Sequence, residues 1–277
     1  MADWPAALQG ARMETIGVSS STSRGVTVTS GAADTKGSWT ELSASTPFDA
    51  DGFFLNLGGA SAMGAGHANF LIDVGIGAAA SEQVIVPDIL HSGIIELGPS
   101  PIYIPIPIRA GTRVSVRAAG DAATLPFDCQ IHLCAGGFFS ALRLGRATSY
   151  GFVAGDTGGT EIDPGGTANT KGSWVQLVAS LDNPICCGVL CLAKPNPVEV
   201  YADLGWLVDI GIGVAASEQV ILNDVRVFGG NLANQFSPIF VPLFIAIKAG
   251  TRVAARAACS SIVAADRVLD IAILGFD

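Results

Sequence analysis

The sequence predicts an all-β protein built from two tandem, duplicated β-sandwich domains of the jelly-roll type, with a short N-terminal arm. Three motifs occur twice in the same order, apolar residues alternate with small or polar ones over short stretches, and 34 Gly and 14 Pro residues punctuate the chain. Turns at this spacing are typical of sandwiches. Long connections between the expected strands favour a jelly roll, and an immunoglobulin-like strand order is the alternative.

The duplication is visible in three blocks. Thr-Lys-Gly-Ser-Trp at 35–39 returns at 170–174, Asp-Val-Gly-Ile-Gly at 73–77 returns as Asp-Ile-Gly-Ile-Gly at 209–213, and Ala-Gly-Thr-Arg-Val at 110–114 returns at 249–253. The spacing between copies grows along the chain, so the length differences are expected in surface loops. We expect an arm at 1–30, a first sandwich at 31–138, a glycine-rich linker at 139–166 and a second sandwich at 167–277.

Alternating apolar residues predict the strands within each copy. Such a period of two is expected of half-buried strands. The first copy has Phe70, Ile72, Val74 and Ile76, and the second has Trp206, Val208, Ile210 and Ile212. We expect seven or eight strands in each copy, beginning near the repeated Thr-Lys-Gly-Ser-Trp motif, and no helix.

Composition and charge restrict the partners. Hydrophobic residues make up 49% of the chain and charged residues only 14%, so we expect apolar surface to be buried against other chains. No apolar run approaches the roughly 20 residues of a membrane-spanning helix, and no membrane association is predicted. The net charge is −9 with scattered Lys and Arg, which argues against nucleic-acid binding. The N-terminus lacks a secretory-signal pattern, so we expect folding in a cytoplasm.

Four pairs of ionisable residues occupy matched positions in the two copies. Because alternate residues of a strand share a face, the two arginines of each copy lie on one polar face. We expect them to pair with the matched carboxylates of their own copy; in the alternative, this face receives an acidic ligand or a neighbouring chain. The matched residues are Asp73 and Asp209, Glu82 and Glu218, Arg113 and Arg252, and Arg117 and Arg256.

Each copy also repeats a tryptophan close to a lysine. Trp39 follows Lys36, and Trp174 follows Lys171. A buried indole contributes a large apolar area once its N–H has a partner, so we expect both tryptophans in the cores. The alternative is a sugar-stacking platform formed by the tryptophan and the lysine.

The sequence predicts no catalytic, cofactor-binding or metal-binding residue. The six cysteines do not match between copies and lack zinc-ligand spacing, so we interpret them as buried small hydrophobes, with incidental disulfides as the alternative. The glycines at 73–77 resemble a nucleotide loop but precede another expected strand rather than a helix. No Gly-x-Ser-x-Gly motif occurs, and the acidic loops lack calcium-loop spacing. Histidines occur only in the first copy, at His67, His91 and His132.

The repeated motifs resemble a module found in predicted structural proteins of tailed bacteriophages. The resemblance covers residues 33–133 and 168–275 and rests on Thr-Lys-Gly-Ser-Trp, Asp-Val/Ile-Gly-Ile-Gly-x-Ala-Ala-Ser-Glu and Ala-Gly-Thr-Arg-Val-x-x-Arg. It implies a virion protein exposed on a head, neck or tail, often as a symmetric oligomer, with a role in decoration, assembly or host contact. It supplies no catalytic motif.

These observations predict a non-enzymatic virion protein of the decoration or fibre type. Its expected partners are further copies of itself and other virion proteins, and it would assemble in the host cytoplasm. The alternative is a carbohydrate-binding module or adhesin that binds a host-surface glycan through Trp206, Tyr201 or Tyr150. A hydrolase on a sandwich is a third hypothesis and would need converging catalytic residues.

Overall fold

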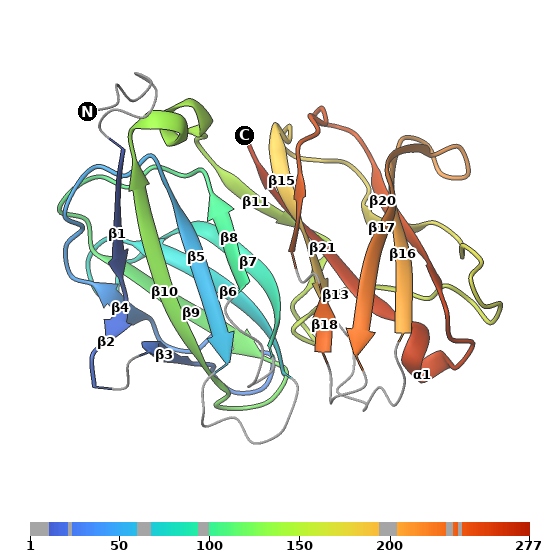
Figure 1. The fold of residues 1–277 in the computed structure, drawn as a ribbon, viewed down its shortest axis with the longest axis horizontal. Coiled ribbons are helices and arrows are strands. Elements are labelled where there is room, and N and C mark those ends of the chain that lie inside the picture. Colours follow the sequence, from blue (N-terminus) through green and yellow to red (C-terminus); the bar gives the residue numbers. More distant parts are fainter. Residues whose placement is uncertain are drawn as a thin grey trace, which may run out of the picture.

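Two β-sandwiches lie side by side in the computed structural model (Figure 1). The structure describes residues 11–21, 24–59, 68–93, 100–193, 204–230, 235–237 and 240–277. Within these ranges the only helices are a 3-10 helix, Gly137–Leu142, and one α-helical turn, α1 (Ala264–Arg267). No helix of the described part is long and apolar enough to cross a membrane. The predicted all-β fold with two tandem sandwiches is confirmed.

The first domain contains ten antiparallel strands in two sheets. One sheet has the order β2-β3-β10-β5-β8, with β1 also paired to β10, and the other has the order β4-β9-β6-β7. The strands are β1 (Arg12–Ile16), β2 (Val18–Ser19), β3 (Arg24–Thr29), β4 (Thr40–Ser43), β5 (Gly52–Gly59), β6 (Ala68–Ile76), β7 (Gln83–Gly93), β8 (Ser100–Ile104), β9 (Val114–Gly120) and β10 (Pro126–Ala135).

The second domain repeats this arrangement and adds one edge strand, β18, which pairs with β17. Its sheets have the orders β12-β13-β21-β15-β19, with β11 also paired to β21, and β14-β20-β16-β17-β18. The strands are β11 (Ala147–Tyr150), β12 (Phe152–Val153), β13 (Gly158–Ile162), β14 (Val175–Val178), β15 (Cys187–Ala193), β16 (Leu204–Ile212), β17 (Gln219–Gly230), β18 (Gln235–Ser237), β19 (Phe240–Leu243), β20 (Val253–Cys259) and β21 (Leu269–Phe276).

The strand orders are those of a jelly roll rather than of an immunoglobulin domain. When the strands are numbered one to eight from β3 to β10, one sheet has the order 1-8-3-6. The other sheet has the order 2-7-4-5. Two four-stranded sheets joined by connections that cross between them define this fold. The strands from β13 to β21 have the same order when the edge strand β18 is left out of the count.

The domain boundaries differ from the expected ones. The expected arm at 1–30 contributes β1, β2 and β3, because β1 and β3 pair with β10. The expected linker at 139–166 contributes β11, β12 and β13, and two of these pair with β21. Residues 1–10 and 22–23 of the arm lie outside the described residues. Each jelly roll therefore begins before the repeated Thr-Lys-Gly-Ser-Trp motif, with a strand that completes its sheet.

Backbone geometry shows that the duplication includes these early strands. Gly17 after β1 and Gly151 after β11 both have positive φ, 77° and 76°. Asp34 and Asn169, which precede the Thr-Lys-Gly-Ser-Trp motifs, both have φ of 57°. Because side chains other than Asn and Asp rarely adopt this region, these turns constrain residue type even where the surrounding sequence has diverged.

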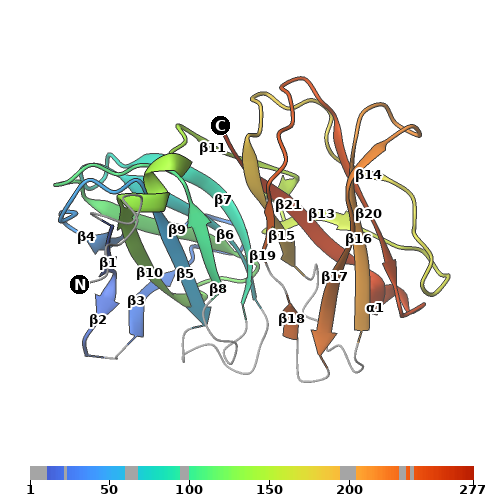
Figure 2. The same cartoon turned by 45° about the horizontal axis from the view of Figure 1, so that its top comes forward.

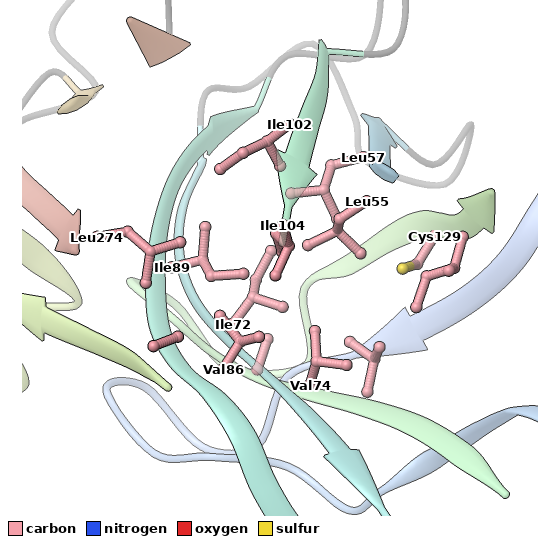
Figure 3. Close-up of a cluster of buried hydrophobic side chains, with 14 of the residues drawn as sticks. Leu55, Leu57, Ile72, Val74, Val86, Ile89, Ile102, Ile104, Cys129 and Leu274 are labelled. Carbon is pink, nitrogen blue, oxygen red and sulfur yellow. The ribbon is translucent and has the colours of Figure 1, made fainter. Parts of the chain in front are cut away.

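Each sandwich has its own core between its two sheets. In the first domain Ile72 and Val74 of β6 face Leu55 of β5 and Cys129 of β10, and all are buried (Figure 3). In the second domain the alternate residues of β21, namely Leu269, Ile271 and Ile273, lie in the core. The intervening β21 residues point to the opposite side of their sheet, where they meet the first domain.

The two domains are joined by an apolar contact between outer sheet faces. Strand β7 packs against β11 and β15, and the same strands lie next to each other in Figures 1 and 2. The cluster that contains the first core continues into Val189, Cys191 and Leu274 of the second domain, and Figure 3 shows Leu274 close to β7 and Ile89. The two jelly rolls therefore share a continuous buried apolar region.

Candidate functional site

The matched ionisable residues meet on the outer face of one sheet in each domain. Asp73 of β6 alternates with the core residues Ile72 and Val74, so its carboxylate points away from the core. Its Oδ1 accepts hydrogen bonds from Lys36 Nζ at 2.7 Å and from the Asp88 backbone N–H at 3.0 Å. Its Oδ2 accepts one from Arg117 Nε at 2.9 Å. These groups bury Asp73 to 3% exposure; we call them the Asp73 cluster.

The second domain contains the same arrangement, which we call the Asp209 cluster. Asp209 Oδ1 accepts from Lys171 Nζ at 2.5 Å and from the Asp224 N–H at 2.9 Å, and Oδ2 accepts from Arg256 Nε at 2.9 Å. The lysines also bond to carbonyl oxygens, Lys36 to Leu71 and Lys171 to Leu207. Each lysine thus ties the loop before the second jelly-roll strand to the middle of the sheet.

Electrostatics favour the charged form of Asp209. Burial by itself raises the pKa of this carboxyl, but the Asp224 N–H and the cations of Lys171 and Arg256 more than offset that effect and lower the pKa below its usual value. The aspartate is therefore a structural anion rather than a proton donor near neutral pH.

A further arginine closes the other end of each sheet, with two carboxylate partners in the first domain and one in the second. Arg113 Nη1 donates to Glu82 at 2.8 Å and its Nε donates to Glu41 at 2.7 Å. Arg252 repeats the first bond with Glu218 at 2.8 Å. Burial raises the pKa of Glu82 and of Glu218, yet the arginine and backbone partners of these two carboxyls lower it overall. The expected pairing of Arg113 with Glu82 and of Arg117 with Asp73 is present, in both copies.

The repeated tryptophans are not core residues. Trp39 is half-buried on the outer sheet face, with its ring against Gly75, where an added Cβ would lie only 2.6 Å from the ring. The Arg117 guanidinium lies 4.5 Å from the ring centroid, a cation–π geometry. Trp174, Gly211 and Arg256 repeat it. The expected core position is incorrect, because the glycine leaves a depression that the indole fills from outside.

Two of the three aromatic residues named for glycan binding are buried. Trp206 and Tyr150 are buried in the second core, and the indole N–H of Trp206 donates to the Arg267 carbonyl at 2.6 Å. Tyr201 lies outside the described residues. Neither buried ring is available to stack on a sugar.

The cysteines do not form a metal or redox site among the described residues. All six cysteines are free. The interpretation as buried small hydrophobes holds for Cys129, Cys134, Cys191 and Cys259, whereas Cys187 is half-buried and Cys186 is exposed, so the interpretation is wrong for Cys186. Burial raises the pKa of the Cys191 thiol to about 12, which makes it a poor nucleophile. No group of side chains suited to a metal ion occurs among the described residues.

Of the three histidines, His91 stacks between Phe70 and Phe240. His132 Nδ1 lies 2.8 Å from the Thr15 hydroxyl, and His67 is outside the described residues. The acidic loops are also used locally, since Asp51 accepts from the Gly136 N–H and the Ser140 hydroxyl, both at 2.8 Å.

The outer faces of the sheets differ between the copies, although their strands match. In the first domain the face formed by β6 and β7 carries Leu71 and Leu90, which are 1% and 0% exposed. The strand register places Leu207 and Arg226 of β16 and β17 at the same positions. Leu207 is 40% exposed and Arg226 is exposed. The second domain covers this face in the first copy, and no described residue covers Leu207 to a similar degree in the second.

The outer face of the other sheet in each sandwich, formed by β5 and β10 or by β15 and β21, also differs between the copies. In the second domain β15 and β21 present Val189, Cys191 and Leu274 to the first domain. By register, the matching residues of β5 and β10 are Phe54, Asn56 and His132, all half-buried. Phe54 lies 5.0 Å from Tyr103 and 6.2 Å from Phe139, measured between ring centroids. The matching positions of the second copy do not form such an aromatic and polar surface. Apart from the alternation of apolar and polar residues in its strands, nothing in the sequence predicted this surface.

Comparisons with known proteins identify no family. No family model and no curated protein matches the chain. A structure of PNGF-II aligns with a TM-score of 0.43 and 8% identity over 95% of this chain, which spans 65% of that structure. The CBM22-1–CBM22-2 tandem domain of Paenibacillus barcinonensis Xyn10C aligns with a TM-score of 0.28 and 12% identity, over 96% of this chain and 91% of that one. A structure of infectious bursal disease virus strain Gx aligns with a TM-score of 0.23 and 12% identity, over 95% of this chain and 71% of that one.

Proposed function

We propose that this chain is a non-enzymatic structural protein of a tailed-bacteriophage virion, exposed on a head, neck or tail and assembling as an oligomer. The observation that carries the proposal is the apolar contact between its two jelly rolls, together with the uncovered copy of one contacting face. Leu207 of that uncovered face is 40% exposed, whereas the matching Leu71 is buried in the contact between domains. A chain that buries one copy of a contact surface and leaves the other copy exposed is suited to assembly with further chains.

The repeated ion clusters support a building-block role. Lys36 and Lys171 each tie a loop to the centre of a sheet through a nearly buried aspartate. Hydrogen-bonded ion pairs of this kind fix the geometry of the groups they join. Each sandwich therefore presents its outer surfaces on a rigid frame, as an assembly subunit requires.

The first test is the mass of the full-length chain, measured by light scattering and sedimentation over a range of concentrations. We expect a species heavier than the 28.2 kDa chain whose proportion rises with concentration. The control is the same measurement in moderate salt, since a contact dominated by apolar burial is less sensitive to screening than one made by surface ion pairs. A monomer at every concentration would contradict the proposed assembly.

A carbohydrate-binding role is the second candidate, and the β5–β10 surface of the first domain favours it. Phe54, Tyr103 and Phe139 form an aromatic group next to the polar side chains of Asn56 and His132. Aromatic faces with neighbouring hydrogen-bonding groups suit sugar rings. Titration calorimetry with bacterial surface polysaccharides tests it: binding that Phe54→Ala abolishes while Phe152→Ala preserves it would favour this candidate, and no binding to any polysaccharide would remove it.

A further inference from the structure

The duplication creates two pairs of complementary faces, of which the chain uses one. The β6–β7 face of the first domain (Leu71, Leu90) packs on the β15–β21 face of the second (Val189, Cys191, Leu274). The unused faces are their counterparts: the β16–β17 face of the second domain and the β5–β10 face of the first. They lie on different domains and cannot meet each other while the contact within the chain is in place.

We propose that the β16–β17 face of one copy docks on the β5–β10 face of a second copy, so that the contact between chains repeats the one within each chain. This inference rests on the proposed assembly function and specifies its surface. It follows from the equivalence of the two domains, because both unused faces have the strand order and register of the faces that already contact each other within the chain.

Side chains on the two unused faces are chemically compatible. The β16–β17 face exposes Leu207 and Phe228, each 40% exposed, on either side of Arg226. The β5–β10 face offers the ring of Phe54, the amide of Gln130 and the carboxylate of Asp128. Apolar contact with Phe54 and hydrogen bonds from the guanidinium to the amide and carboxylate oxygens would pair the two faces.

The proposed contact is more polar than the one within the chain. Arg226 replaces Leu90, and Asn56, Gln130 and His132 replace Cys191, Ala272 and Leu274 in the register. A contact between different faces does not close on itself in a dimer, so it generates rings or filaments. The chain would then add to an assembly with its second domain against the first domain of the next copy.

The test uses two full-length variants that each damage one face. Leu207→Asp with Phe228→Asp alters the β16–β17 face, and Gln130→Arg places a cation on the β5–β10 face opposite Arg226. Leu207 and Phe228 are exposed and Gln130 is half-buried, so circular dichroism spectra like that of the unchanged chain are expected. The matched control is Val214→Asp, at a 77% exposed position outside both faces, and its mass should equal that of the unchanged chain.

Light scattering on single and mixed variants separates the outcomes. We expect each variant alone to be a monomer and their equimolar mixture to form a 1:1 dimer, because each contributes the face that the other lacks. If the unchanged chain assembles and the variants do also, the docking faces are wrong but the assembly function stands. Monomeric variants that do not combine would also overturn the inference, since both changes would then affect one symmetric contact. A monomeric unchanged chain would reject the proposed function itself.

Discussion

Replacing Asp209 by asparagine is expected to lower the free energy of unfolding by about 3 kcal/mol, at the low end of what is found when one partner of a buried ion pair is removed. The change leaves Lys171 and Arg256 without their shared anion, and it places an amide N–H₂ against groups that are themselves donors. Asp73→Asn should have an effect of similar size in the first domain, because its partners and distances are nearly the same.

Urea unfolding followed by tryptophan fluorescence measures this loss, and Asp224→Asn is its control. Asp224 pairs with the same Lys171 at 3.1 Å, but its side chain is 55% exposed, so its loss should cost less than about 1 kcal/mol. Equal losses for Asp209→Asn and Asp224→Asn would show that the cluster adds little to stability.

The effect of Asp209 should also depend on pH. Its pKa is lower in the folded chain than in the unfolded chain. Its contribution is therefore fully present above the unfolded value, near 4, and is lost as the pH falls through the folded value. The difference in stability between the unchanged chain and Asp209→Asn should shrink below about pH 4.

Matched motifs made much of the fold accessible from the sequence. Residues that recur at the same relative place, such as Arg113 and Arg252 with Glu82 and Glu218, had to serve something common to both copies, and a shared strand face restricted their partners. Strand alternation around Ile72 and Val208 placed the sheets. These inferences depended only on local periodicity and on repetition, which a single sequence contains.

The remaining features depend on contacts between distant residues. β3 lies within the segment that the sequence predicts as an arm, because the polar residues around Val26 and Val28 give no sign that this segment pairs with β10. The general tendency of an indole to be buried places Trp39 in the core, whereas its actual position is set by the absence of a side chain at Gly75. Which copy of a sheet face is covered depends on how the domains pack, and no local pattern specifies that.

The contact between domains predicts the second large effect, which follows replacement of Leu90 by arginine, the residue at the matching position of the second copy. Leu90 is 0% exposed, and its backbone lies beside the Cys191 thiol in the contact. An arginine there would bury a charge with no counter-ion among the apolar residues Val189 and Leu274, which costs at least about 3 kcal/mol. We expect the two jelly rolls to separate and to unfold in two transitions instead of one.

Scanning calorimetry, at protein concentrations where light scattering gives the mass of one chain, distinguishes one transition from two. Leu207→Arg is the matched control, because it places the same side chain on the corresponding face of the second domain, where the position is 40% exposed; a change within about 0.5 kcal/mol is expected there. A single unshifted transition for Leu90→Arg would mean that the contact between domains contributes little to stability. Two transitions for Leu90→Arg alone would show that the same sheet face holds the domains together in one copy and is free for another partner in the other, because Leu90 and Leu207 lie on neighbouring strands of corresponding faces that differ in what covers them.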